Sequence, residues 1–461
     1  MAYGECTETR AGPQHSPSFI ASVGWTIGRC NSTTITSGAR NQGDELSVLG
    51  GGTSNCRAAP EMTPSPPSAL AGLRVLDLSR VLAGPLCAQM LADHGASVIK
   101  VEPPDGDEAR RFGPPLDERG EVAYFGALNR GKRSIAVDLS LPAGRAVLER
   151  LLVNADVLVE NFLPGTMEKW GLGYETTLAG RHPRLIYCSV SGFGADGPLG
   201  GLPGYDAVLQ AICGLMSVNG TPDSGALRLG VPVVDYLTGY NALSGVLLAL
   251  AARERSGFGQ RVEATLFDTG LALLIPHASN WFYSGRIPQR MGSSHPNIAP
   301  YDRYPTADGE IFLGVVNNGQ FKRFCECVAR PDLALDPRFA DGSMRLEHRD
   351  ALRTEIERAL LGFEVDPLCR DLMHRGVPAG PVNDVAQALS QAHATHRAMV
   401  VDEHGRRSLG VPVKLSATPG RAGSLPPRLS EHASAILAEL GFDTGAAEAL
   451  LVQGAVVRPP A

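Results

Sequence analysis

The sequence predicts an α/β fold, with a large domain built on a doubly wound, Rossmann-like parallel sheet and a smaller α+β domain. Three observations support this: short apolar runs alternate with helical stretches from residue 73 onward, turn signals separate them, and the pattern changes near residue 285. Strands that alternate with helices pair in parallel through right-handed connections. In such sheets, ligands bind beyond the carboxyl ends of the strands.

The elements of the large domain are predicted from apolar periodicity and from helix start and stop signals. Strands are expected at 75–78, 98–101, 135–139, 157–160, 185–190 and 261–264. Helices are expected at 86–94, from Pro142 onward, and over the small-residue stretch from Tyr236 to Arg253. Gly95 stands where a left-handed residue would end the first of these helices.

The pattern past residue 285 is that of a smaller α+β unit. Asp308-Gly309 lies between two apolar runs and indicates a hairpin, and helices are expected at 320–328 and 349–361. A further helix is expected near 432–440. The expected segments are a disordered extension over 1–67, large domain over 68–285, small domain over 286–385, and large domain again over 386–461.

The first 61 residues are rich in Ser, Thr, Gly and Asn and show no periodicity, so we expect them not to fold. They lack the apolar core of a secretory signal, although three arginines in an acid-free stretch leave an organelle transit peptide open. Met62 is an alternative start, and removal of residues 1–61 is expected to leave function unchanged. We expect a cytoplasmic location, with the mitochondrion as the alternative.

Net charge, cysteine spacing and apolar run length indicate which classes of partner and metal to expect. The formal net charge of −6 and the pI near 6.0 argue against nucleic acid or an anionic membrane as a general partner. The nine cysteines lack metal-ligand spacing, which predicts reduced thiols and no metal site. The most apolar run, 245–252, falls short of the ~20 residues of a membrane helix, so we expect no membrane span.

Residues 192–197, Gly-Phe-Gly-Ala-Asp-Gly, match the dinucleotide-binding fingerprint after an expected strand. A helix cannot open behind them, because Pro198 and Pro203 flank two more glycines, and the pyrophosphate would lack its helix N-terminus. The Gly-x-Ser-x-Gly elbow and the Gly-Lys-Ser/Thr loop are both absent. We therefore expect neither a nicotinamide enzyme nor a serine or nucleotide hydrolase.

Two carboxylates stand out by position, Asp206 and Asp235. Asp235 ends an apolar run just before the long helix, where backbone amides and the helix dipole would favour the ionised form and so keep a nucleophile ionised. From position alone, a plain N-cap is the commoner role for Asp235. Asp206 could be a capping residue as well.

Several separated motifs recur in a known order. They are residues 73–77 with 80–85, Gly95 with 98–102, Asn129 with 132–134, 160–162 with Pro164-Gly165, Gly204-Tyr205-Asp206, Asp235, and 257–260. Together they resemble the class III coenzyme A (CoA) transferases, the CaiB/BaiF family, from Leu70 to about Val456. The resemblance implies an interlocked homodimer whose large domain is built from both chain ends.

The resemblance also implies the chemistry. The aspartate that matches Asp235 attacks an acyl-CoA thioester to form a mixed anhydride, and the released thiolate returns to give an aspartyl-CoA thioester. An acceptor acid then takes the CoA. A site that excludes water and offers backbone amides to the oxyanion makes a carboxylate competent for this attack. Acyl-CoA and the acid enter as substrates, and no permanently bound cofactor is implied.

The family's site residues carry over to matching positions. Val81, Leu82 and Ala83 would line the thioester end, Asn161, Pro164 and Gly165 would hold the nucleotide end, Lys169 would contact phosphate, and Tyr205 and Asp206 would flank the nucleophile. Two positions depart from the pattern of formyl and oxalate transferases: Pro103 replaces an arginine and Leu82 replaces a glutamine. Formate and oxalate are therefore not the expected substrates.

Two alternatives remain. The related α-methylacyl-CoA racemases carry Gly-His-Asp at the position of Gly204-Tyr205-Asp206, and a tyrosine with a pKa near 10 replaces their histidine base poorly. The other alternative is a non-catalytic acyl-CoA-binding protein, against which the presence of Asp235 argues.

The acid is suggested by the small domain, which resembles the branch of succinyl-CoA:glutarate transferases. The motifs are 290–292, His295, 300–301, 308–309, 317–318, 320–321 and 380–383. We therefore expect succinyl-CoA as donor and glutarate, malate, itaconate or a related diacid as acceptor, with carnitine and bile acids as competing classes. A buried distal carboxylate needs a cation or several donors, for which the candidates are Arg80, Arg228, His295 and Arg303.

Overall fold

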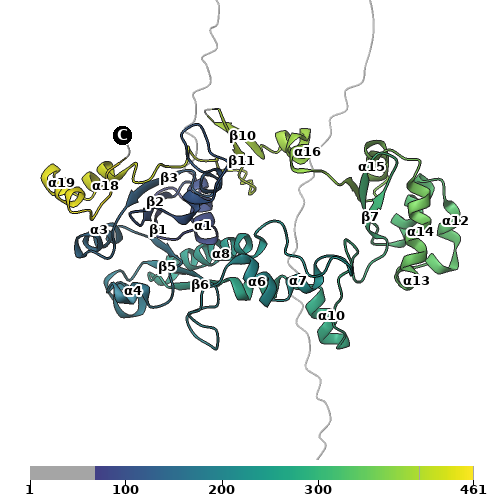
Figure 1. Ribbon diagram of the computed structural model, residues 1–461, viewed down its shortest axis with the longest axis horizontal. Coiled ribbons are helices and arrows are strands. Elements are labelled where there is room, and N and C mark those ends of the chain that lie inside the picture. Colours follow the sequence, from purple (N-terminus) through teal and green to yellow (C-terminus); the bar gives the residue numbers. More distant parts are fainter. Residues whose placement is uncertain (1–67, 404, 460–461) are drawn as a thin grey trace, which may run out of the picture. The chain divides into compact units, whose positions relative to one another are not determined.

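The structure is a computed structural model that describes residues 68–403 and 405–459. The extension over 1–67 therefore lies outside the described residues, as does any expectation about a transit peptide. Six strands form one parallel sheet in the order β3-β2-β1-β4-β5-β6 (Figure 1). They are β1 (Arg74–Asp77), β2 (Ser97–Glu102), β3 (Lys132–Ala136), β4 (Val157–Glu160), β5 (Ile186–Ser191) and β6 (Arg261–Thr265).

This strand order is doubly wound and confirms the predicted α/β architecture, because the chain reverses its direction of travel across the sheet between β1 and β4. All five strand pairs are parallel. A reversal point of this kind leaves a crevice at the carboxyl ends of the two central strands, where ligands bind in open α/β sheets.

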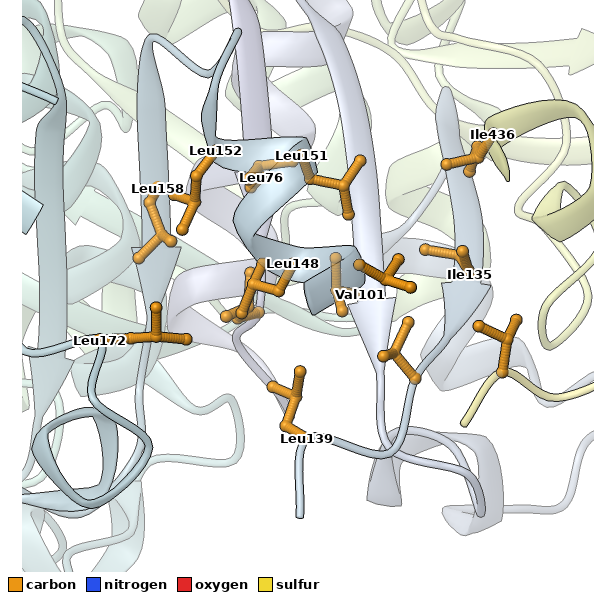
Figure 2. Close-up of a cluster of buried hydrophobic side chains, with 14 of the residues drawn as sticks. Leu76, Val101, Ile135, Leu139, Leu148, Leu151, Leu152, Leu158, Leu172 and Ile436 are labelled. Carbon is orange, nitrogen blue, oxygen red and sulfur yellow. The ribbon is translucent and has the colours of Figure 1, made fainter. Parts of the chain in front are cut away.

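Alternate residues of the strands enter two different cores. Val157 of β4 packs with α1 (Ala83–Asp93) and α8 (Val233–Ser256), whereas its neighbour Leu158 packs with α3 (Pro142–Leu152). Figure 2 shows Leu148, Leu151 and Leu152 of α3 against the strands, together with Ile436 of α18 (Ala433–Glu439). Helices on both faces account for strands that are buried along most of their length.

Strand β3 begins three residues earlier than the apolar run at 135–139 predicts. Lys132 and Ser134 interrupt the apolar pattern, yet both are buried within the strand. Lys132 Nζ lies 2.7 Å from Asp77 of β1, and Ser134 Oγ lies 2.7 Å from Glu102 of β2. Buried polar partners from other strands cannot be read from the periodicity of one segment.

Helix α8 begins at Val233, three residues before the expected start at Tyr236. Within the part of the chain that the structure describes, it is the one helix long and apolar enough to cross a membrane, with a mean hydropathy of 1.3. The expectation of no span rested on the shorter run 245–252. Ala242, Val246 and Ala249 of α8 are buried in the core between this helix, α1 and the sheet.

A second, antiparallel sheet has the order β7-β8-β9, with β7 (Tyr301–Pro305), β8 (Glu310–Gly314) and β9 (Ala379–Pro381). The predicted hairpin at Asp308-Gly309 joins β7 to β8. Its core includes residues of α11 (Asn318–Cys327), α14 (Arg349–Leu360) and α15 (Val365–His374). This is the smaller α+β unit that the sequence predicts.

The remaining elements lie within these units, connect them or follow them. They are the 3₁₀ turns 108–111 and 337–339, the π turn 174–178, α2 (Ala123–Leu128), α4 (Thr166–Lys169), α5 (Ala179–Arg181), α6 (Asp206–Ile212), α7 (Leu215–Val218), α9 (Leu266–Ala272), α10 (His277–Ser284), α12 (Pro331–Leu335), α13 (Gly342–Glu347), α16 (Val385–Ser390), α17 (Ala392–His396), the hairpin β10 (Val400–Glu403) and β11 (Arg406–Leu409), and α19 (Thr444–Val452). Ile436 and Leu437 share a core with Leu76 and Ile135, so the C-terminal helices pack on the parallel sheet.

Candidate active site

A pocket of about 270 Å³ lies at the reversal point of the parallel sheet. Its walls come from the segments that follow β1 and β4, from the end of β5, from the segment before α6, and from the first turn of α8. The lining residues are 80–83, Glu108, 161–164, 190–192, 202–205, Asp235 and Leu266. Of the predicted site residues, seven line this pocket: Val81, Leu82, Ala83, Asn161, Pro164, Tyr205 and Asp235.

A glycine of α8 allows the close approach of α8 to the start of α1. A Cβ atom at Gly239 would lie 2.8 Å from the carbonyl oxygen of Ala83, so only glycine permits this contact between α8 and α1. Asp235 precedes Gly239 by four residues and therefore faces the same side of α8. Ala83, at the start of α1, and Asp235 line the same pocket.

Asp206 caps helix α8. Its Oδ2 accepts hydrogen bonds from the backbone amides of Val234, at 2.8 Å, and Asp235, at 3.2 Å. The residue at the N-cap position is Pro232, whose side chain makes no capping bond. Asp235 is thus not the N-cap, and its carboxylate is left free to face the pocket.

Gln210 in turn orients Asp206. Its side-chain amide donates to Asp206 Oδ1 at 2.6 Å, and its carbonyl oxygen accepts from the backbone amide of Leu229 at 2.8 Å. Gln210 is completely buried. The capping carboxylate is therefore held from both of its oxygens, which keeps it directed at the first turn of α8.

The ionisation of Asp235 differs from the sequence-based expectation. Burial, and after it the charge of Asp206, raise the pKa of Asp235 from 3.8 to about 7. The sequence predicted the opposite direction because the helix amides were assigned to Asp235, whereas Asp206 receives them. A carboxylate that is desolvated beside a second acid is harder to ionise and, once ionised, is poorly solvated and reactive.

Gly192, the first glycine of the apparent dinucleotide fingerprint, lies where another backbone segment passes close to it. A Cβ at Gly192 would lie 3.0 Å from Cα of Gly204, and a Cβ at Gly204 would lie 3.1 Å from Cα of Gly192. The two backbones pass each other in the pocket wall where no side chain fits. No helix follows β5 until α6 begins at Asp206, so these glycines do not form a dinucleotide loop.

Asn161 binds the segment on the opposite side of the pocket. Its Oδ1 accepts from the Arg80 amide and its Nδ2 donates to the Arg80 carbonyl oxygen, both at 2.8 Å. These two bonds tie the segment after β4 to the segment after β1 across the reversal point. Asn161 thus has a positioning contact that its assignment to the nucleotide end did not include.

Gly165 and Lys169 lie outside this pocket. Gly165 lines a separate cavity of about 100 Å³ and begins α4 in a left-handed conformation, with φ of 85°. Lys169 is exposed at the end of α4. Its neighbours Thr166 and Trp170 line a second cavity, of about 360 Å³, next to the ends of β1 and β2.

This second cavity adjoins the first, because Arg80, Phe162 and Leu163 line both. Pro103, at the position where formyl transferases carry an arginine, lines it as well. A molecule with a reactive end and a long anionic end could therefore extend from Asp235 along the carboxyl edge of the sheet.

One of the four candidate residues for a distal carboxylate lies at the pocket. Arg80 lines it, with Nη1 3.2 Å from Oε1 of Glu108. Arg228 donates to backbone carbonyls beside it, the Nδ1 of His295 accepts from the Asn297 amide, and Arg303 pairs with Glu310 at 3.0 Å. None of these three lines the pocket.

Sequence reasoning missed Glu108, Ser191 and Leu266, which line the pocket. Ser191 ends β5 and could have been found, because the carboxyl ends of central strands form such crevices. Glu108 and Leu266 come from connections whose path only the fold determines. No group of three or more His, Cys, Asp or Glu side chains suited to a metal lies together within residues 68–403 and 405–459.

The chain matches the family model described as CoA-transferase family III over residues 70–433. It is 42% identical over 382 residues to the succinate–glutarate CoA-transferase of Agrobacterium fabrum, which covers 80% of this chain and 95% of that protein. It is 39% identical over 392 residues to the succinyl-CoA:mesaconate CoA-transferase of Haloarcula marismortui, covering 82% and 98%. A crystal structure of a CaiB/BaiF family protein from Brucella suis superposes with a TM-score of 0.74 at 41% identity, covering 81% of this chain and 100% of that one.

Proposed function

Because the chain belongs to CoA-transferase family III, we propose that it moves CoA from succinyl-CoA to a short dicarboxylate by way of Asp235. The enzyme class, a class III CoA-transferase, follows from the family. The proposal rests above all on one observation: the Asp235 carboxylate enters the pocket while a second acid, Asp206, caps its helix. The names of the two relatives, which pair succinate or succinyl-CoA with diacids, support the choice of substrates.

The reaction runs in four balanced steps. The Asp235 carboxylate attacks the carbonyl carbon of succinyl-CoA, the carbon–sulfur bond breaks, and a mixed anhydride and CoA thiolate result. The thiolate attacks the aspartyl carbonyl, releasing succinate and leaving aspartyl-CoA. The acceptor carboxylate attacks this thioester and expels the thiolate, which then attacks the acceptor's acyl carbonyl. A new thioester leaves, and the Asp235 carboxylate is regenerated.

The nucleotide end of CoA fits the second cavity. Arg80, Phe162 and Leu163 form the wall that this cavity shares with the Asp235 pocket, and Lys169 lies beside residues that line it. A cation near the rim would meet a phosphate without having to be buried, which avoids most of its desolvation cost. The thioester would then lie at Val81, Leu82 and Ala83, opposite Asp235.

Arg80 is the residue we assign to the distal carboxylate of the diacid. It lies in the same pocket as Asp235, and its guanidinium, over the Phe162 ring at 5.7 Å from the centroid, can donate two hydrogen bonds to a carboxylate. Its partner Glu108 is partly exposed, so an arriving anion can replace it. A monocarboxylate would leave this cation without a new partner.

The test is a panel of donors and acceptors read by mass spectrometry. Succinyl-CoA with glutarate, malate or itaconate is expected to turn over, whereas carnitine and simple monocarboxylates are not. Arg80→Gln should lower kcat/KM for the diacid by about 10- to 100-fold, the loss of one charged hydrogen bond. Arg303→Gln, which removes an equivalent arginine–glutamate pair outside the pocket, is the control.

The same panel separates the alternatives. Turnover confined to monocarboxylates would contradict the dicarboxylate assignment and leave the transfer mechanism standing. Scrambling at the α-carbon of an acyl-CoA, with no exchange of label between acid and thioester, would instead identify a racemase. A protein that binds acyl-CoA and does neither would be a binding protein.

The functional unit in this proposal is an interlocked homodimer. Helix α8 buries one side and exposes apolar residues on another, among them Leu248, which is 72% exposed, and Tyr283 of α10 is 94% exposed. An interface would cover such exposed apolar side chains. A second copy of the chain is the occupant that the family resemblance implies.

Light scattering should find a dimer in solution. Leu248→Glu should weaken it, because a charge would be buried in the interface, whereas Leu335→Glu, at a leucine of the smaller unit that is 83% exposed, should not. A stable and active wild-type monomer would contradict the dimer.

A further inference from the structure

We propose that Asp107 is a positioning residue for CoA transfer: by holding Val81 in a left-handed backbone conformation, it places Leu82 and Ala83 opposite Asp235. The inference rests on the proposed function, since it concerns how the same pocket is kept in shape. Asp107 does not line the pocket and would touch no substrate.

Val81 has an unfavourable backbone conformation. Its φ is 68°, in the region that glycine adopts readily and that a β-branched residue almost never adopts. Such a residue keeps this conformation only where the surrounding structure holds it, and residues of this kind cluster at functional sites. Val81 lies in the pocket wall, one residue before Leu82 and two before Ala83.

Asp107 keeps Val81 in this backbone conformation through a hydrogen bond to its amide. Its Oδ1 accepts from the amide of Val81 at 3.1 Å and from the amide of Ala109 at 2.9 Å. Its Oδ2 lies 3.0 Å from Nζ of Lys100. Asp107 and the Lys100 side chain are 0% exposed, so these contacts do not compete with water.

The same buried charges bind the rest of the segment. Nζ of Lys100 donates to the Ser79 carbonyl oxygen at 2.8 Å, and the Ser79 amide donates to Asp77 at 3.0 Å. Nζ of Lys132 bridges Asp77, at 2.7 Å, and the Pro85 carbonyl oxygen, at 2.8 Å. Two acids and two lysines thus fix the backbone from Ser79 to Pro85, on both sides of Val81.

Fold stability alone does not account for this network. Buried ion pairs contribute little net stability compared with well-packed apolar side chains, because each charge must first be desolvated. Asp77, Lys100, Asp107 and Lys132 each bind a backbone group between Ser79 and Pro85, and the further contacts of Asp107 with Ala109 and of Lys132 with Asn129 hold these side chains in place. The structure therefore assigns it to the geometry of one segment, and that segment faces Asp235.

A change in the backbone at Val81 would alter the distance between the pocket wall and Asp235, and so the rate of the reaction. If Val81 relaxed to a negative φ, the chain direction after it would change, and Leu82 and Ala83 would move relative to Asp235. A displacement of about 1 Å between reacting groups can cost about 100-fold in rate. Binding of the distant nucleotide end would change much less, so kcat should fall more than KM rises.

A double-mutant cycle tests the inference. Asp107→Ala should lower kcat by at least about 100-fold in the wild-type background. In a Val81→Gly background, where glycine adopts the conformation unaided, it should lower kcat by less than about tenfold. Val81→Gly itself is expected to lose some activity, because its side chain lines the pocket. If Asp107→Ala lowers kcat by the same factor in both backgrounds, the two residues are not coupled and the inference is overturned.

Two further variants separate positioning from general damage. Asp107→Asn keeps an oxygen for the Val81 amide and should lose far less kcat than Asp107→Ala; an equal loss would overturn the proposal. If Asp107→Ala fails to fold, Asp107→Asn takes its place in the double-mutant cycle. Asp117→Ala is the matched control, since Asp117 accepts from two amides at 2.9 Å and pairs with Arg406 at 3.0 Å, away from the pocket. It should leave kcat unchanged.

Hydrogen exchange provides a readout that needs no turnover. Asp107→Ala, or Asp107→Asn to a smaller degree, should speed exchange in the peptide over 79–86 and leave the β5 peptide over 186–191 unchanged. Unchanged exchange at 79–86 would overturn the inference even with transferase activity present. A wild-type enzyme that turns over no acid in the panel would instead contradict the proposed function, and the exchange result would still decide the role of Asp107.

Discussion

Asp235→Ala should abolish CoA transfer, with kcat reduced by at least about 1,000-fold, while succinyl-CoA continues to bind. In the proposed mechanism Asp235 contributes the covalent step, whereas the residues proposed to bind CoA lie in the segments after β1 and β4 and along the second cavity. Steady-state kinetics measures the first effect and calorimetric titration with CoA the second. Asp235→Asn, which keeps the shape of the side chain, should be equally inactive.

The control is Asp268→Ala. Asp268 is the third residue of α9, as Asp235 is of α8, but it does not line the pocket, so its removal should leave transfer unchanged. Wild-type enzyme treated with succinyl-CoA and hydroxylamine should carry a modification at Asp235 by peptide mass spectrometry. Transfer activity retained by Asp235→Ala would refute the assignment of the nucleophile.

Activity should rise with pH through about 7, because the pKa of Asp235 is raised to about 7 and only its carboxylate attacks. An acid with this pKa is protonated at lower pH, so kcat/KM should fall about tenfold for each unit below 7. Stopped-flow or discontinuous assays from pH 5 to 9 measure the profile. A flat profile over this range would show that Asp235 is ionised throughout.

Asp206→Asn identifies the cause of the shift. Removing the neighbouring charge should lower the pKa of Asp235 and move the rising limb of the profile toward acid, while the asparagine oxygen can still cap α8. A limb that does not move would mean that burial alone sets the pKa. Glu263→Gln, a loss of one negative charge that does not line the pocket, should leave the limb in place.

The raised pKa of Asp235 should also make the free energy of unfolding depend on pH, in a direction that can be predicted. The folded-state pKa of Asp235 lies above its ordinary value of 3.8, so the folded protein holds more protons than the unfolded chain between about pH 4 and 7. The contribution of this group to stability is therefore lost as pH rises through that window. Asp235→Asn should raise the free energy of unfolding at pH 8, by at most about 4 kcal/mol.

The sequence alone determined the order and type of the main elements. The strand Val157–Glu160 was predicted to the residue, and the hairpin at Asp308-Gly309 was also predicted, because local periodicity and turn chemistry decide both. Alternation of strands and helices predicted the doubly wound sheet. A doubly wound sheet also predicts a ligand site at the carboxyl ends of its strands. In this sheet that site lies where β1 and β4 are neighbours.

Only the tertiary structure decided the chemistry of the site. Asp235 reads as an N-cap in sequence, but the capping carboxylate comes from Asp206, 29 residues away. Because Asp206 receives the helix amides, the pKa of Asp235 is raised, whereas the sequence predicted that it would be lowered. Asp107 likewise acts on Val81 across 26 residues. Capping, desolvation and backbone strain depend on which groups surround an atom, and in a parallel sheet with long crossovers those groups come from distant parts of the chain.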